Sequence, residues 1–209
     1  MFPEQAMRVE RLRHFHRSRV WAPLLGMALF LTLAQVHASS GQALQDLITH
    51  VRERNALAAP VAESKWCTSK PVTDVARERE VLSRAAAEAA ARGVPAKRAE
   101  RFFAALIEAN KQVQYQRLWE WRSGETAPPA ASACAKAGLA EVREALNRLQ
   151  PLLLQDLART ATLLQRPDCE ERIARAVSME IHRQRLHSSA ARALVRALGG
   201  FCEVAQAQR

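Results

Sequence analysis

The chain has 209 residues, of which 48% are hydrophobic and 25% charged, and its formal net charge at pH 7 is +10. This length suits one domain with a sizeable hydrophobic core. The positive charge favours anionic ligands, but the chain has one tyrosine and no basic stripe that alternates with aromatic residues, so we expect no nucleic-acid partner.

Residues 1–38 are typical of an export signal. A segment with five arginines precedes an uncharged apolar run over residues 20–33, and Val36, His37 and Ala38 then form a suitable cleavage site. The apolar run is short for a membrane span. We expect cleavage after Ala38, which leaves residues 39–209 as a periplasmic or secreted domain with no membrane partner. An uncleaved N-terminal anchor is the alternative, and Met7 is an alternative start.

The remaining residues predict an all-α fold. Alanine, leucine, arginine and glutamate dominate, glycine is scarce, and no alternating strand pattern occurs. We therefore expect a single-domain helical bundle of about six helices. The first helix is predicted over residues 41–57, and Pro60 then ends or restarts the chain before a short helical turn with Lys65 and Trp66. The apolar face of the first helix consists of Leu44, Leu47, Ile48 and Val51.

The later helices are delimited by caps and prolines. Thr73 is predicted to cap a helix that runs to about residue 91, with Gly93 as its C-terminal stop. Pro95 opens a long helix to residue 121, and residues 123–132 form the clearest loop. A helix over residues 134–165 follows, then Pro167, and two last helices over residues 169–187 and 189–206. Neither a domain linker nor an internal repeat is apparent.

Several polar residues fall on the apolar faces of these helices. Each one alone has an ordinary structural explanation: a buried arginine stem, a solvated helix turn, a satisfied amide or a surface lysine. Together they carry more cations than carboxylates, and burying such a set without a counter-anion is costly. The pattern therefore predicts a pocket for a ligand with about two negative charges. Its candidate residues are Arg54, Lys65, Asp74, Arg77, Glu78, Asn110, Gln114 and Arg143.

The order and spacing of these residues resemble a known family. Arg54 is followed by Lys65-Trp66, Asp74 and Arg77-Glu78, and then by Asn110 and Gln114, four residues apart. This arrangement resembles the all-helical AroQ-type chorismate mutases over about residues 42–205. The export signal, Arg143 and the pair Cys169 and Cys202 narrow the resemblance to the secreted, gamma-class members.

The resemblance implies an isomerase that converts chorismate to prephenate by a Claisen rearrangement, with no cofactor. It implies that Arg54, Arg77 and Arg143 bind the two carboxylates of the substrate. It also implies a homodimer with one complete pocket in each chain. A non-catalytic periplasmic binding or chaperone-like protein for anionic partners is the main alternative, and a helix bundle on a membrane surface is a weaker one.

The other site residues receive their roles from the same resemblance. Lys65 and Gln114 are the catalytic pair that donates to the ether oxygen of the substrate. Glu78 accepts from the ring hydroxyl, while Asp74 and Asn110 complete the polar lining. Some secreted members have a glutamate in place of Gln114, and some have a polar residue in place of Val81, so one hydrogen bond of their pocket is not expected here.

All four cysteines lie beyond the predicted signal, and an even number in an exported chain indicates disulfides. The family resemblance implies a bond between Cys169 and Cys202. A second bond between Cys67 and Cys134 is possible and would tie the Lys65 segment to the start of the Arg143 helix. The chain lacks CxxC and HExxH motifs, and its histidines lack ligand spacing, so we predict no metal site.

Overall fold

The computed structural model describes residues 41–134 and 138–202. The predicted export signal at residues 1–38 lies outside this part of the chain. Within it, the regular structure is helical and the predicted all-α class is confirmed. The chain forms a helix over residues 41–56, followed by α2 (Ala58–Cys67), α3 (Val75–Ala90), α4 (Ala96–Ser123), α5 (Ala131–Cys134), α6 (Ala140–Arg159), the 3₁₀ turn η1 (Leu163–Gln165), α7 (Cys169–Arg183) and α8 (Ser188–Leu198).

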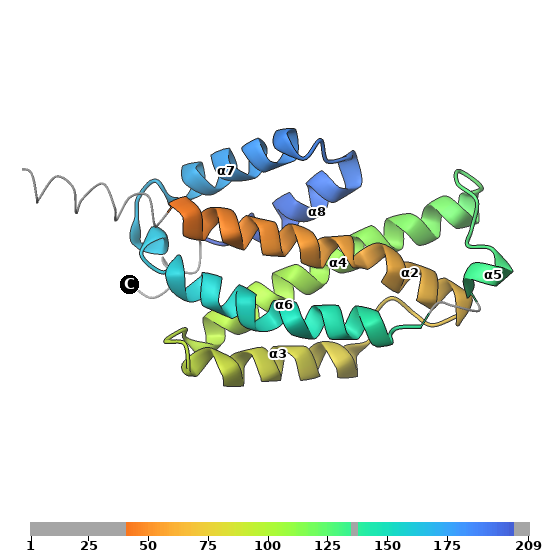
Figure 1. The fold of residues 1–209 in the computed structure, drawn as a ribbon, viewed down its shortest axis with the longest axis horizontal. Helices are drawn as coiled ribbons and strands as arrows, with labels where there is room; N and C mark the ends of the chain where they lie inside the picture. The colour runs from red at the N-terminus through yellow and green to blue at the C-terminus, as the bar shows by residue number, and fades with distance from the viewer. Residues whose placement is uncertain (1–40, 135–137, 203–209) are drawn as a thin grey trace, which may run out of the picture. The chain divides into compact units, whose positions relative to one another are not determined.

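Helix α4 is the central element of the bundle. It packs against α2, α3 and α8, and its buried face includes Phe103, Leu106 and Val113. Figure 1 shows α3 and α7 at opposite edges, with the helix over residues 41–56, drawn in orange, and α6 between them. The predicted inner face of that first helix is confirmed, because all four of its members are buried in the common core: Leu44, Leu47, Ile48 and Val51.

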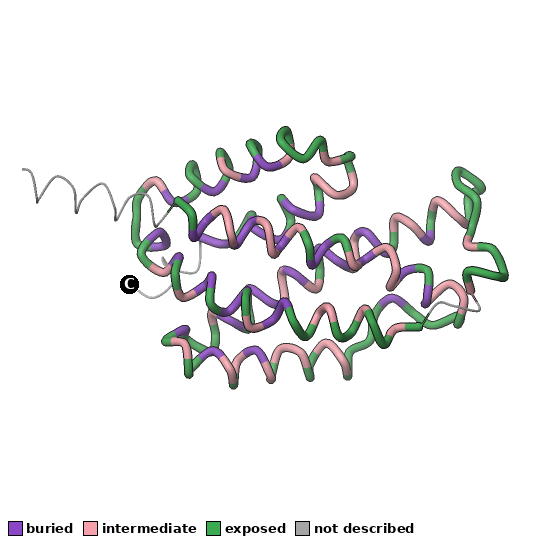
Figure 2. The backbone as a smooth tube through the Cα atoms, in the orientation of Figure 1, coloured by how far each residue is buried: buried purple, intermediate pink, exposed green. Residues whose placement is uncertain are grey.

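Helix α3 packs against the bundle with only its C-terminal half. Its buried residues are Ala85 and Ala89, whereas the first two turns are half-buried or exposed (Figure 2). The small alanine side chains allow close approach to α4 at one end. At the other end, the polar and charged side chains of α3 remain available to line a cavity.

Several predicted helix boundaries are wrong for identifiable reasons. Asp74, and not Thr73, caps α3, because a carboxylate accepts the free N–H groups of a first turn well and the Thr73 hydroxyl instead bonds to Tyr115. The helix predicted over residues 134–165 begins at residue 140 and ends at residue 159. There the Thr160 hydroxyl lies 2.6 Å from the Asp156 carbonyl oxygen and competes with the helix pattern.

The last helix also ends earlier than predicted. It stops at Leu198, directly before Gly199 and Gly200, because two glycines in succession disfavour a helix. The predicted helix end at residue 206 lies outside the described residues. Conversely, Gly93 adopts a φ of +68° just beyond α3, as expected for a glycine that terminates a helix.

Covalent and ionic contacts hold the outer elements to this core. The structure pairs Cys169 with Cys202 and also Cys67 with Cys134, so all four cysteines are bonded. The fully buried Glu180 side chain of α7 accepts from Arg52 of the first helix at 3.0 Å. None of the helices in the described part of the chain has the length and apolar character needed to cross a membrane.

Candidate active site

The candidate residues from all parts of the sequence line one cavity. Its walls come from the first helix and from α2, α3, α4 and α6, and its volume is about 160 Å³. Cavities of about 150 Å³ accommodate a benzene-sized ring, so there is room for a small cyclic ligand. The cavity contains every residue that we predicted for it: Arg54, Lys65, Asp74, Arg77, Glu78, Asn110, Gln114 and Arg143.

Arg54 is a buried cation on the inner face of the first helix. Its Nη1 atom donates to the Leu106 carbonyl oxygen at 3.2 Å, and among the described residues no carboxylate lies within ion-pair distance of it. Desolvation lowers the Arg54 pKa to about 10, so the guanidinium remains charged at neutral pH. A ligand carboxylate would supply the counter-charge that the protein does not provide at this point.

Two buried amides on α4 form a directed chain that starts at this arginine. Asn110 Nδ2 donates to the Arg54 backbone oxygen at 3.4 Å, which turns Asn110 Oδ1 toward Gln114 Nε2 at 2.6 Å. The orientation of the Gln114 amide is thereby determined. One of its two N–H groups is used, and its buried Oε1 atom has no hydrogen-bond partner among the described residues. One N–H and one carbonyl group therefore remain for a ligand.

Lys65 reaches the cavity from the last turn of α2. Its Nζ atom donates to the Val72 backbone oxygen, and within the described part of the chain it has no carboxylate at ion-pair distance. Burial lowers the Lys65 pKa below its usual value, while the charges of Asp74 and Glu78 oppose this effect. The ammonium group is thus partly desolvated and held by a neutral acceptor, which a ligand oxygen can replace. The bond between Cys67 and Cys134 fixes the chain two residues beyond it.

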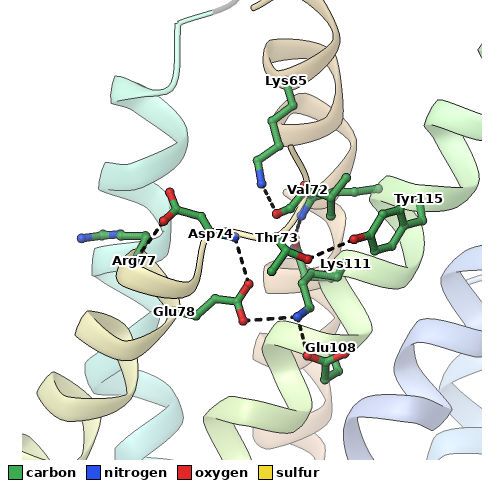
Figure 3. A network of polar contacts seen from close by, with 11 residues as sticks. Lys65, Val72, Thr73, Asp74, Arg77, Glu78, Glu108, Lys111 and Tyr115 are labelled. Carbon is green, nitrogen blue, oxygen red and sulfur yellow. Dashed lines mark hydrogen bonds and ion pairs between the residues drawn. The ribbon is translucent and has the colours of Figure 1, made fainter. Parts of the chain in front are cut away.

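The start of α3 forms the rim of the cavity (Figure 3). Asp74 Oδ1 accepts from the Arg77 backbone N–H at 3.1 Å, and Glu78 Oε1 accepts from the Asp74 backbone N–H at 3.2 Å. These reciprocal bonds resemble a capping box shifted by one residue. The exposed Asp74 carboxylate therefore acts on the helix terminus, although the residue also lines the cavity. Glu80, an exposed residue, pairs with the Arg77 guanidinium at 2.6 Å.

Sequence analysis missed two further cations in this cavity. Arg84 lies three residues after Val81 on the same helical face, and Lys111 lies four residues after Ile107, so the spacing could have indicated both. Arg84 Nη2 donates to Asn147 at 3.0 Å, and its buried Nε atom has no partner among the described residues. With these two, the lining holds six cations and two carboxylates, a net charge of 6 − 2 = +4.

Arg143 completes the cationic set from the first turn of α6. It lines the cavity although it is an exposed residue, and among the described residues its side chain has no ion pair within 4 Å. The arrangement can bind a compact dianion, while Lys65 and Gln114 offer donors from two different helices. Among residues 41–134 and 138–202, no cluster of three or more histidine, cysteine or acidic side chains could hold a metal ion.

Comparison with known proteins relates this geometry to one family. The family model described as chorismate mutase type II matches residues 45–115. A secreted chorismate mutase of Mycobacterium tuberculosis is 26% identical over 160 residues, which cover 77% of this chain and 78% of that protein. A secreted chorismate mutase of Mycolicibacterium smegmatis is 24% identical over 155 residues, which cover 73% of this chain and 83% of the relative.

Two solved structures share both fold and sequence with the chain. The crystal structure of a chorismate mutase from Burkholderia phymatum is 33% identical with a TM-score of 0.70, and the match covers 78% of this chain and 98% of that one. The chorismate mutase from Burkholderia thailandensis is 37% identical with a TM-score of 0.71, and the match covers 77% and 99% of the two chains.

The cap formed by Asp74 leads to a prediction about stability. The substitution Asp74→Ala should lower the free energy of unfolding by about 1 kcal/mol, because it removes the acceptor for the Arg77 N–H. Asp74→Asn is the matched control and should remain close to the wild type, since asparagine caps a helix about as well as aspartate. Chemical unfolding followed by circular dichroism measures the difference. An equal loss in both variants would show that the charge matters and not the cap.

Proposed function

This chain belongs to the chorismate mutase family, and we propose that it is an exported AroQ-type enzyme that converts chorismate to prephenate in the cavity described above. The observation that carries the proposal is that eight residues line one cationic cavity within a single chain. All eight were named from sequence spacing and family resemblance. The solved relatives, which share a third or more of its aligned residues, support the same activity.

The reaction is an intramolecular Claisen rearrangement. One C–O bond of the ether breaks while one C–C bond forms, so all atoms are conserved and no second reactant takes part. The substrate must adopt a compact chair-like conformer, and negative charge grows on the ether oxygen in the transition state. Orientation of the substrate and stabilisation of this charge are therefore the two tasks of the protein.

Three arginines are proposed to hold the substrate carboxylates. Arg54 is buried and has no counter-anion among residues 41–134 and 138–202, so it suits a carboxylate of the ligand. Arg77 and Arg143 approach from α3 and α6. Arg77 pairs with Glu80 through Nη1, so its other N–H groups remain for the ligand, and loss of this partly exposed pair would cost little. Binding of both carboxylates would restrict the side chain of the substrate to a compact conformer.

Lys65 and Gln114 are proposed to donate to the ether oxygen. The bond from Lys65 to a backbone oxygen is exchanged for one to the substrate, and the ammonium then lies close to the charge that forms. Gln114 donates through the N–H group that is not used by Asn110. Asn110 has the supporting role of setting the amide orientation, because its own nitrogen is tied to the Arg54 carbonyl.

Glu78 is proposed to accept the ring hydroxyl of chorismate. Each of its carboxylate oxygens already accepts one hydrogen bond, from the Asp74 N–H and from Lys111, and each retains a further lone pair. Val81 lies on the same cavity wall and offers no hydrogen bond. The hydroxyl end of the substrate is therefore expected to bind near the α3 rim.

Export of this enzyme is proposed on two grounds. Both curated relatives are named as secreted chorismate mutases. The chain also has four cysteines in two disulfide bonds, which form and persist in oxidising compartments. We propose that residues 1–38 are the cleaved signal and that residues 39–209 are the mature enzyme.

We also propose that the mature enzyme is a homodimer whose two cavities are each complete within one chain. Exposed apolar and aromatic side chains on α4 and α8 supply surface suited to association: Tyr115, Trp119 and Val195.

Sedimentation of the mature chain should give twice the mass of one chain. Glu substitution of Val195 should weaken association without abolishing activity, whereas a monomer at every concentration would contradict the dimer.

The central prediction concerns consumption of chorismate. The purified mature chain should deplete chorismate absorbance, and Lys65→Ala should lower kcat by about 10² to 10³, because a preorganised donor to the forming charge is lost. Arg77→Ala should lower kcat/KM with a larger share in KM. Circular dichroism verifies that both variants are folded. An inert wild-type chain, or an active Lys65→Ala variant, would favour a binding protein instead.

A second prediction concerns pH and Gln114. The amide does not titrate, so between about pH 5 and 8 kcat/KM should not fall through loss of a proton at this position. In Gln114→Glu the donor is a carboxylic acid, which is lost as pH rises through its pKa, so activity should increase toward acid pH. Gln114→Met, which cannot donate, should be slow at every pH. A Gln114→Glu profile as flat as the wild type would contradict the donor role.

A further inference from the structure

Lys111 of α4 is a cavity residue that the family motif does not include. Its Nζ atom lies 3.2 Å from Glu78 Oε2 and 2.6 Å from Glu108 Oε1, and its side chain is only 15% exposed. The ammonium thus sits between an inner carboxylate on α3 and an outer one on its own helix (Figure 3). Its bond to Glu108 makes the largest contribution to raising the Lys111 pKa, so it is charged at neutral pH.

Glu78 is therefore tied to α4 by two routes. Directly, Lys111 holds its Oε2 atom. Indirectly, the Tyr115 hydroxyl is 3.0 Å from the Thr73 hydroxyl, and the next residue, Asp74, donates its N–H to Glu78 Oε1. Lys111 and Tyr115 are four residues apart and so project from one face of the helix. Both carboxylate oxygens have defined partners, which leaves little freedom for the side chain to rotate.

This restraint matters because Glu78 lies among cations that compete for it. Burial lowers the Lys65 pKa, and the charges of Asp74 and Glu78 oppose this effect, so Glu78 acts on Lys65 although the two side chains are not paired. If Glu78 rotated onto a neighbouring cation, its carboxylate would lose its place in the cavity lining. The hydrogen bond from Lys111 to Glu78 Oε2 opposes such a rotation.

We propose that Lys111 is a positioning residue that orients Glu78 to accept the ring hydroxyl of the substrate. The proposal rests on the proposed function, since it assigns a role within that same site. Glu108 contacts Lys111 on the solvent side, and Glu78 contacts it on the cavity side. The three residues therefore form two consecutive ion pairs from the surface to the cavity. Lys111 would thereby contribute to selection of a hydroxylated substrate without touching the bond that breaks.

The simpler reading is that Lys111 only stabilises the packing of α3 on α4. The two readings differ in substrate dependence. A packing role reduces turnover of any substrate equally, whereas a role through Glu78 requires the ring hydroxyl. The probes are therefore chorismate and its analogue in which hydrogen replaces the ring hydroxyl.

The test compares kcat and KM of the mature wild-type chain, Lys111→Met and Lys111→Arg with both probes. Lys111→Met keeps an apolar stem of similar length and should lower kcat/KM for chorismate about tenfold, because Glu78 loses a charge-assisted hydrogen bond. For the analogue the change should be less than about twofold. Lys111→Arg should recover most of the activity. Equal losses with both probes would overturn the proposal.

A double-mutant cycle with Glu78→Gln provides a second readout. If Lys111 acts through Glu78, adding Lys111→Met to Glu78→Gln should have little further effect, whereas two additive losses would contradict the inference. Glu108→Gln is the matched control and should have a smaller effect in the same direction. Should Lys111→Met fail to fold, as judged by circular dichroism, Lys111→Gln takes its place in the same cycle.

The outcomes also separate this inference from the proposed function. A wild-type chain that is inert on chorismate overturns the proposed function, and the role of Lys111 is overturned with it. A wild-type chain that is active, together with a Lys111→Met variant that is equally active on chorismate, overturns the role of Lys111 alone.

Discussion

The burial of Arg54 is the constraint on which the site depends. A guanidinium group on the inner face of the first helix cannot be solvated by water, and in the described part of the chain its side chain finds one backbone carbonyl and no carboxylate. A buried cation without a counter-ion is costly, and in the proposed function a substrate carboxylate offsets this desolvation cost on binding. The same residue orients the amides of α4, since its backbone oxygen receives Asn110 and thereby sets the direction of Gln114.

The remainder of the fold holds the other cavity residues in position around Arg54. Helix α4 provides the support from which the amides and Lys111 project, and the fully buried residues of α3 are two alanines in its C-terminal half. The two disulfides restrain the segment after α2 and the ends of the α7–α8 hairpin. A hydrogen bond between His50 and Asp156 and an ion pair between Arg52 and Glu180 fix the first helix against α6 and α7, which in turn fixes Arg54. A reaction that needs only orientation and charge is well served by such a restrained pocket.

The helical fold and most of the cavity could be predicted from the sequence, but the partners of individual side chains could not. The stripe through Leu47, Val51 and Arg54 identified a cation on a buried face, and the shared face of Asp74, Arg77 and Glu78 identified the rim. The predicted role of Asp74 as a lining residue did not anticipate that its carboxylate caps α3, because capping at a helix start depends on backbone direction at that residue. Lys111 and Arg84 were missed because single cations near a stripe usually extend into water.

The sequence by itself determined the helices and their inner faces, because residues three and four apart lie on one side of a helix whatever surrounds it. The order of its polar residues carried the resemblance to the family. The tertiary structure alone decided that Lys111 meets Glu78, that the second bond joins Cys67 and Cys134, and that the Gln114 amide has one N–H to spare. The first two contacts join residues more than thirty positions apart. The third depends on such a contact, the hydrogen bond from Asn110 to the Arg54 carbonyl oxygen. Distances of that kind follow from how helices cross and where loops return, which periodicity along a chain does not encode.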